Sequence, residues 1–173
     1  MIFHIIIKNN PKELFMRKIK PLPLIISIAI AEITGLLSAL LSGVFGDKYE
    51  SFVQPPLSPP AVVFPIAWTL LYAFMGAAAY FVWDSVKGSR AERSTALKVY
   101  CAQLFVNFLW SIVFFRFEAF WTAVAVIILL DILVILTTVK FKNINRLAYW
   151  LMLPYIAWIL FATYLNIGVA WLN

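Results

Sequence analysis

The stretch from Gln54 to Tyr80 reads QPPLSPPAVVFPIAWTLLYAFMGAAAY. Four prolines fall within residues 55–60, and an uncharged apolar run follows them. Proline stiffens a connecting segment, and a run of about 20 mostly apolar residues is long enough to cross a bilayer. The pattern therefore predicts a stiff loop that leads into a membrane helix carrying Trp68 and Tyr72.

The rest of the chain has the same apolar character. Hydrophobic residues make up 64% of the sequence and charged residues 13%, whereas charged residues are about 25% of a soluble protein. The mean hydropathy is +0.91. We predict an all-α integral membrane protein, a bundle of five transmembrane helices. The expected helices cover residues 22–45, 61–84, 96–116, 119–139 and 147–172, in a membrane domain of residues 22–173 that follows a basic tail, residues 1–21.

The basic residues predict the orientation of this bundle. Twelve Lys and Arg residues lie in the tail and in the second and fourth connections, and two lie in the first and third connections. Because cytoplasmic connections carry an excess of Lys and Arg, we expect a cytoplasmic N-terminus, an outer C-terminus and a proline-rich loop on the outside. The net charge of +6 then reflects topology, and nucleic acid is not an expected partner. The first apolar run is longer than the core of a signal peptide, so a spanning helix is favoured over a cleaved signal.

Two acidic residues, Glu32 and Asp131, lie inside expected membrane helices. A carboxyl group within the bilayer is costly and therefore faces a polar partner or a wet cavity. A structural and a functional role both stay open for each, and a proton-coupled transporter that uses Glu32 and Asp131 is an alternative function. Near Glu32 a small residue recurs every four positions, which favours close helix packing over a dimer seam. These residues are Ala31, Gly35, Ala39 and Gly43.

Three expected helices gather aromatic or polar residues on one face, with helical spacing. The residues are Trp68, Tyr72, Met75 and Ala79 in the second helix; Gln103, Asn107, Trp110, Ser111 and Phe114 in the third; and Tyr155, Trp158, Ala162 and Leu165 in the fifth. Core packing and a ligand pocket are both open for the aromatic faces. The amides of Gln103 and Asn107 require an inward direction, since lipid offers them no partner. Residues 46–58 form the longest outer connection, and we expect this loop to cover the pocket as a lid.

The sequence offers little for metal or disulfide chemistry. It contains one cysteine, Cys101, and one histidine, His4. No disulfide within the chain is therefore predicted, and no zinc or iron–sulfur site. We predict no required cofactor, no catalytic residue and no metal site.

Three blocks of motifs, between Tyr49 and Leu172, resemble the TspO/MBR family of tryptophan-rich sensory proteins and translocator proteins, also known as peripheral-type benzodiazepine receptors. The blocks are Pro55…Pro59-Pro60…Pro65…Trp68…Tyr72…Met75-Gly76…Tyr80, then Tyr100…Gln103-Leu104…Asn107…Trp110-Ser111…Phe114-Phe115, and Pro154-Tyr155…Ala157-Trp158…Phe161-Ala162-Thr163…Leu165-Asn166. The resemblance implies a five-helix bundle, commonly a homodimer. It also implies that porphyrins such as protoporphyrin IX or a haem-like molecule, and other flat hydrophobic ligands, bind inside the bundle under the first loop. The short length, the basic tail and the absence of a presequence-like Arg/Ser pattern favour a bacterial plasma membrane.

The resemblance also implies site residues, since positions matching Trp68, Asn107, Trp158 and Ala162 border the family's pocket. Combined with the helix faces, it gives a predicted ligand site. Its members are Tyr49, Pro59, Trp68, Tyr72, Gln103, Asn107, Trp110, Phe114, Tyr155, Trp158, Ala162 and Leu165. We expect a sensor, regulator or transporter of tetrapyrroles. Light-dependent porphyrin breakdown is an alternative that loses weight, because a loop position where the family commonly has tryptophan is Leu57 here.

Overall fold

The computed structural model describes residues 19–44 and 48–173, so the expected tail lies outside the described residues up to position 18. The elements are α1 (Pro21–Ser42), α2 (Val63–Trp83), α3 (Arg90–Ser111), the π-helix η3 (Ile112–Arg116), α4 (Phe120–Ile144) and α5 (Arg146–Leu172). Because η3 continues α3, the described part of the chain has five helices that are long and apolar enough to cross a membrane. The predicted all-α, five-span fold class is confirmed.

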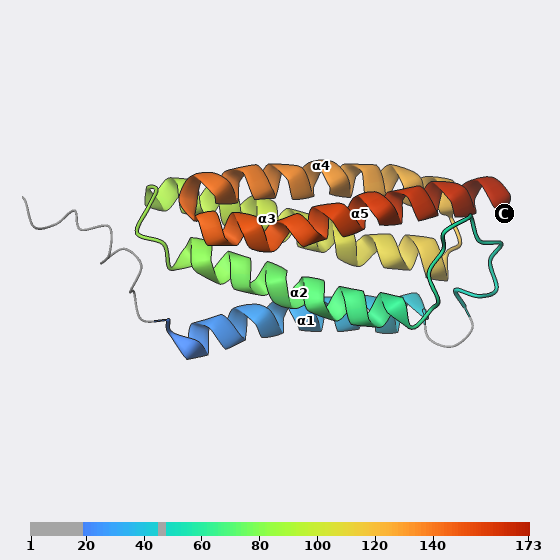
Figure 1. Cartoon of the computed structure of the whole chain (residues 1–173), viewed down its shortest axis with the longest axis horizontal. Coiled ribbons are helices and arrows are strands. Elements are labelled where there is room, and N and C mark those ends of the chain that lie inside the picture. The colour runs from blue at the N-terminus through green and yellow to red at the C-terminus, as the bar shows by residue number, and fades with distance from the viewer. Residues whose placement is uncertain (1–18, 45–47) are drawn as a thin grey trace, which may run out of the picture.

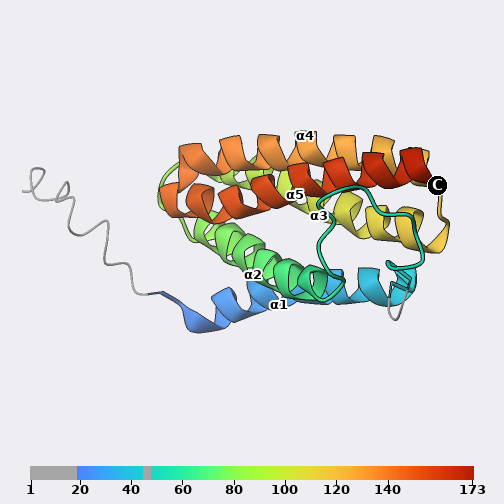
Figure 2. The same cartoon turned by 45° about the vertical axis from the view of Figure 1, so that its right-hand side comes forward.

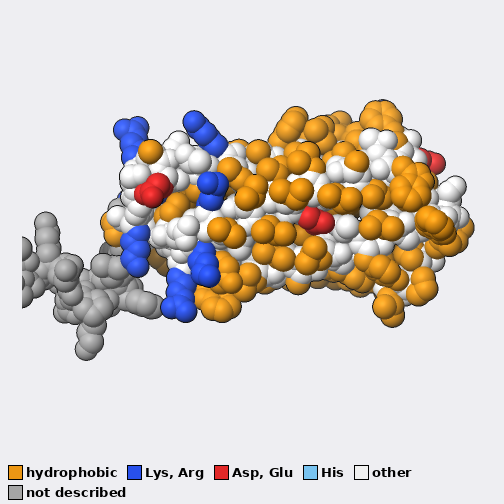
Figure 3. Space-filling model, turned by 90° about the horizontal axis from the view of Figure 1, so that it is seen from above, with side chains coloured by type: hydrophobic (Ala, Val, Ile, Leu, Met, Phe, Trp, Pro, Cys, Tyr) orange, Lys and Arg blue, Asp and Glu red, His pale blue; other side chains and the backbone are white. Residues whose placement is uncertain are grey.

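The helices form one elongated bundle, with α1 lying along α2 on one side (Figures 1 and 2). The connection from α1 to α2 and the C-terminus lie at one end, which we call the lid end. The connections from α2 to α3 and from α4 to α5 lie at the opposite end, which we call the basic end. Figure 3 shows Lys and Arg side chains gathered at the basic end and hydrophobic side chains over most of the remaining face.

Local signals explain where the observed helix ends differ from the predicted ones. Helix α1 ends at Ser42 because Gly43 has a φ of 68°, the left-handed conformation that commonly terminates helices. Helix α3 begins at Arg90, ahead of the predicted residue 96. Its first turn is held by a capping box, in which the Ser89 hydroxyl accepts from the Glu92 backbone N–H and the Glu92 carboxylate accepts from the Ser89 backbone N–H.

Helix α1 packs against α2 through small residues and hydroxyl groups. The backbones approach so closely at Gly76 that a Cβ there would lie 2.5 Å from the Ile28 Cα. The Ser27 hydroxyl donates to the Gly76 carbonyl oxygen at 2.7 Å. On α1, Gly35 leaves space that the Tyr72 ring occupies. Gly35, one member of the small-residue pattern of α1, therefore serves packing within the chain.

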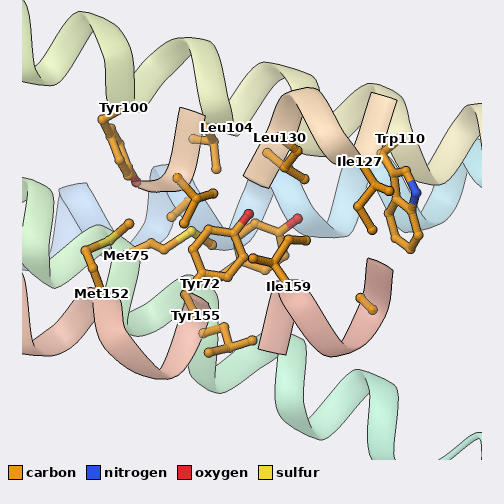
Figure 4. Close-up of a cluster of buried hydrophobic side chains, with 14 of the residues drawn as sticks. Tyr72, Met75, Tyr100, Leu104, Trp110, Ile127, Leu130, Met152, Tyr155 and Ile159 are labelled. Atoms are coloured by element: carbon orange, nitrogen blue, oxygen red, sulfur yellow. The ribbon is translucent and has the colours of Figure 1, made fainter. Parts of the chain in front are cut away.

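A buried apolar cluster joins α2, α3, α4 and α5. Figure 4 shows Tyr72 and Tyr155 in the middle of this cluster, with Met75 and Met152 on one side and Trp110 on the other. All five of these side chains are buried. Packing of this kind fixes the aromatic face of α2 against the inward face of α5.

The segment before α2, residues 48–62, is named the lid loop, and it is anchored on α5. The Tyr164 hydroxyl donates to the Pro56 carbonyl oxygen at 2.7 Å. The Asn173 side chain accepts from the Val53 backbone N–H at 2.9 Å and donates to the Val53 carbonyl oxygen at 3.0 Å. The proline-rich loop therefore bridges α5 and the start of α2 (Figure 2).

The beginning of the lid loop has a second set of anchors near η3. Phe52 is buried, and its ring centroid lies 5.9 Å from that of Phe114 and 5.1 Å from that of Phe120. Lys48 forms an ion pair with Glu118 in the connection between η3 and α4. These contacts hold the loop across the lid end of the bundle.

Candidate ligand pocket

A cavity of about 580 Å³ lies between α1, α2, the second half of α3 and η3. Val44 and two lid-loop residues, Tyr49 and Ala61, complete its wall on the lid side. Pockets for small molecules have volumes of about 300–1,000 Å³ and are mostly apolar with a few polar groups. The cavity has the size and composition of such a site.

Trp68 of α2 is the centre of the aromatic wall. Its ring centroid lies 5.7 Å from Tyr72 and 6.3 Å from Trp110, and all three residues line the cavity. Tyr155 and Trp158 of α5 lie against Trp68 at 6.2 and 6.4 Å. These separations are typical of paired aromatic rings. The rings of α5 thus support Trp68, whereas α2 and α3 supply the aromatic surface of the cavity.

The polar groups of α3 bind across to α5. The Asn107 amide donates to the Tyr155 hydroxyl at 2.8 Å, and the Trp110 indole N–H donates to the Asn166 side-chain oxygen at 2.8 Å. Buried polar groups need such partners. Asn107 also lines the cavity, so one side chain serves both as a link between helices and as a polar group of the wall.

The roof residue Tyr49 is buried beside the cavity, and its ring centroid lies 4.6 Å from that of Phe64. Burial raises the pKa of the Tyr49 hydroxyl above its ordinary value. A neutral aromatic roof over an aromatic wall favours an apolar occupant.

The two intramembrane acids have different surroundings. Glu32 lines the cavity from α1 and has no hydrogen bond or ion pair within the described residues. Asp131 of α4 accepts a hydrogen bond from the Thr163 hydroxyl at 2.9 Å. Helices α1 and α4 lie on opposite sides of the bundle (Figures 1 and 2). The structure therefore does not bring the two acids together into one relay.

Five of the twelve predicted site residues line the cavity, and the others lie elsewhere. The lining ones are Tyr49, Trp68, Tyr72, Asn107 and Trp110; the remaining ones are Pro59, Gln103, Phe114, Tyr155, Trp158, Ala162 and Leu165. Among the latter, Gln103, Phe114, Ala162 and Leu165 are buried in the bundle. The motifs and helical spacing predict a face of α5 on the pocket, but no α5 residue lines this cavity.

The wall residues absent from the predicted site come from α1, from α2 and from the ends of the neighbouring segments. They are Glu32, Ile33, Gly35, Leu36, Ala39, Val44, Ala61, Phe64, Pro65, Thr69, Ser111 and Phe115. The π-helix η3 explains Phe115, because a π-turn inserts one extra residue per turn. The ring centroids of Phe114 and Phe115 lie 5.6 and 6.3 Å from that of Trp110, and of the two only Phe115 lines the cavity. The sequence carried one signal that α1 lines a cavity. This signal was the carboxyl group of Glu32 next to the small residues Gly35 and Ala39.

These features define a polytopic helical membrane protein with an aromatic cavity beneath a proline-rich loop. Residues 26–172 match the model of the TspO/MBR family, and the chain belongs to this family, as the motifs indicated. It is 39% identical to the tryptophan-rich protein TspO of Archaeoglobus fulgidus over 125 residues, which is 72% of this chain and 79% of that protein. It is 38% identical to the tryptophan-rich sensory protein of Cereibacter sphaeroides over 127 residues, 73% and 77% of the two chains. Identity to the Homo sapiens translocator protein is 32% over 118 residues, 68% and 70% of the two chains.

Proposed function

We propose that this membrane protein binds porphyrins and similar flat hydrophobic ligands and acts as a sensor, regulator or transporter of them. The observation that carries the proposal is the cavity of about 580 Å³ lined by Trp68, Tyr72 and Trp110. Flat π-systems stack favourably on indole and phenol rings. The family membership adds support, because the resemblance implied tetrapyrrole ligands.

The charges around the cavity favour one orientation of a porphyrin. The carboxyl group of Glu32 lies in the α1 wall, and an ionised carboxylate repels the acidic side groups of a porphyrin. Arg116 lies at the lid end and forms no ion pair within the described residues, whereas Lys48 at the same end is paired with Glu118. We therefore place the acidic edge of the ligand toward the lid end and its apolar edge toward Trp68 and Tyr72.

Titration of the purified full-length protein with protoporphyrin IX tests the proposal. Trp68→Ala should weaken binding about tenfold or more, because it removes a stacking surface and apolar contact area together worth at least about 1.4 kcal/mol. Trp150→Ala is the matched control, since Trp150 is exposed on the surface of α5 and should leave affinity unchanged. Equal affinity of the folded Trp68→Ala variant and the parent protein would refute this pocket as the binding site.

A further inference from the structure

A second hollow, of about 520 Å³, lies at the basic end, between the end of α2 and the first turns of α3. It is separate from the aromatic cavity and shares no lining residue with it. Three basic side chains, Arg90, Arg93 and Lys98, line the hollow together with Trp83 and Leu97. We call it the basic groove.

Arg90, Arg93 and Lys98 form no ion pair within the described residues. The ion pair at the basic end joins Lys20 to Asp84 and the one at the lid end joins Lys48 to Glu118, so neither includes one of these three residues. The nearby Glu92 carboxylate accepts from the Ser89 backbone in the capping box. A topological role accounts for basic residues in this connection, but it does not require three of them to line one hollow.

The groove continues into an apolar surface that runs along the bundle. Leu97, Cys101 and Phe105 are spaced four residues apart, so they follow one side of α3 away from the basic end. Leu97 and Cys101 line the groove, and Phe105 is exposed one turn further on. Trp83, also exposed, lies at the groove, and tryptophan prefers the boundary between headgroups and acyl chains. The groove thus has basic side chains at the end of the bundle and an apolar surface that extends from them along α3. This arrangement is complementary to an amphiphile with an anionic headgroup.

We propose that the basic groove binds an anionic phospholipid, with the headgroup phosphate at Arg90, Arg93 and Lys98 and an acyl chain along Leu97, Cys101 and Phe105. Guanidinium groups bind phosphate through paired, charge-assisted hydrogen bonds. Basic pockets at helix ends are known to hold anionic lipid headgroups. This site is independent of the aromatic cavity, so its test does not depend on porphyrin binding.

Cys101 provides the reporter, because it is the only cysteine of the chain, it is exposed, and it lines the groove. The full-length protein is placed in nanodiscs of phosphatidylcholine alone or with phosphatidylglycerol, and alkylation of Cys101 by an uncharged maleimide is followed. We expect phosphatidylglycerol to slow alkylation several-fold. We also expect native mass spectrometry to detect phosphatidylglycerol retained on the protein. Absence of both effects would overturn the proposal.

A variant and a matched control separate a specific site from general surface charge. Arg90→Gln/Arg93→Gln/Lys98→Gln should weaken retention and protection at least about tenfold, since each basic group contributes a factor of about five for an anionic membrane surface. Lys140→Gln/Lys142→Gln/Arg146→Gln removes the same charge at the same end of the bundle, outside the groove, and should keep both effects. Equal loss in the two variants would overturn the proposal.

Two further measurements complete the test. If the triple variant does not fold, Lys98→Gln alone should reduce protection about fivefold, and an unchanged rate would count against the site. Inorganic phosphate added to phosphatidylcholine nanodiscs should not protect Cys101. Protection by inorganic phosphate equal to that by phosphatidylglycerol would assign the groove to a free anion and refute the lipid.

Discussion

The hydrogen bond between Asn107 and Tyr155 joins the wall of the aromatic cavity to α5. Both side chains are almost completely buried, with 1% and 0% of their surface exposed. In such a setting an unpaired polar group costs more than the bond itself contributes, because the group loses water without gaining a partner. The contribution of each residue to stability therefore depends on the presence of the other.

A double-mutant cycle on this pair should show strong coupling. Asn107→Leu leaves the Tyr155 hydroxyl without its partner, and we expect it to lower the free energy of unfolding by about 1–3 kcal/mol. Adding Tyr155→Phe should restore part of that loss, because both polar groups are then absent. Reversible unfolding in detergent micelles provides the measurement. Strictly additive effects of the two substitutions would contradict the coupling.

Among the elements, the lid loop has no regular secondary structure but is fixed by individual side chains. Tyr164 and Asn173 hold it to α5, and Phe52 inserts beside η3. Proline lowers the entropy that the loop loses on docking. Few contacts are therefore enough to keep the loop closed over the cavity.

Removing one loop anchor should measurably loosen the lid loop. Tyr164→Phe deletes the hydrogen bond to the Pro56 carbonyl oxygen, which is worth about 1 kcal/mol net. We expect hydrogen exchange in residues 48–62 to accelerate about fivefold and bound protoporphyrin to dissociate faster. Tyr149→Phe, on the same helix at the basic end, is the control and should change neither rate. An unchanged exchange rate in Tyr164→Phe would show that the other anchors are sufficient.

The contact of α1 with α2 should be sensitive to a single added methyl group. In Gly76→Ala the new Cβ meets the α1 backbone at Ile28, which cannot rotate away, so we expect a loss of about 1–3 kcal/mol in stability. Gly35→Ala instead meets the Tyr72 ring. It should displace that ring and weaken porphyrin binding more than it lowers the unfolding temperature. A Gly76→Ala variant as stable as the parent would show that the helices can separate without penalty.

The sequence could predict the number of helices because uncharged apolar runs of this length have few other uses. The start of α3 was harder to predict. The first turns of that helix carry the charged residues Arg90, Glu92 and Arg93, so a search for apolar runs does not include them. The capping box at Ser89 was the local signal that could have found it. The π-turn at η3 left no trace in the helical spacing, which therefore gave no reason to expect Phe115 on the cavity wall.

The predicted site and the cavity wall coincide only in part, for a different physical reason. Aromatic faces on α2, α3 and α5 do point inward, but the spacing within one helix does not say which inward faces enclose space and which pack solidly. Tyr155 and Trp158 fill the space behind Trp68, and the cavity opens instead beside the small residues of α1. That distinction depends on how closely neighbouring helices approach, which a single sequence does not specify.

On the scale of the whole molecule, charge divides the two ends of the bundle. Lys and Arg side chains gather at the basic end (Figure 3), where the connections from α2 to α3 and from α4 to α5 lie. The positive-inside rule predicts that this end faces the cytoplasm. The lid loop and the C-terminus would then lie on the opposite side of the membrane.

Single-cysteine labelling in intact cells tests this orientation. With Cys101→Ser as background, Leu57→Cys places a thiol in the lid loop at a position that is 83% exposed, and Lys87→Cys places one at the basic end. A membrane-impermeant maleimide should label the first variant in intact cells and the second only after the membrane is opened. The reverse pattern would invert the predicted topology.

The position of α1, between the aromatic cavity and the surrounding lipid, affects how ligand affinity must be measured. Ile33 and Leu36 line the aromatic cavity and are 54% and 57% exposed, on a helix that lies at one side of the bundle (Figure 1). Acyl chains therefore contact the same side chains as the occupant does. We expect a hydrophobic molecule to partition between the protein and the surrounding lipid, with occupancy set by its mole fraction in the bilayer. Diluting loaded proteoliposomes with fusion-competent empty vesicles should then empty the site in proportion to the lipid added, at constant aqueous volume.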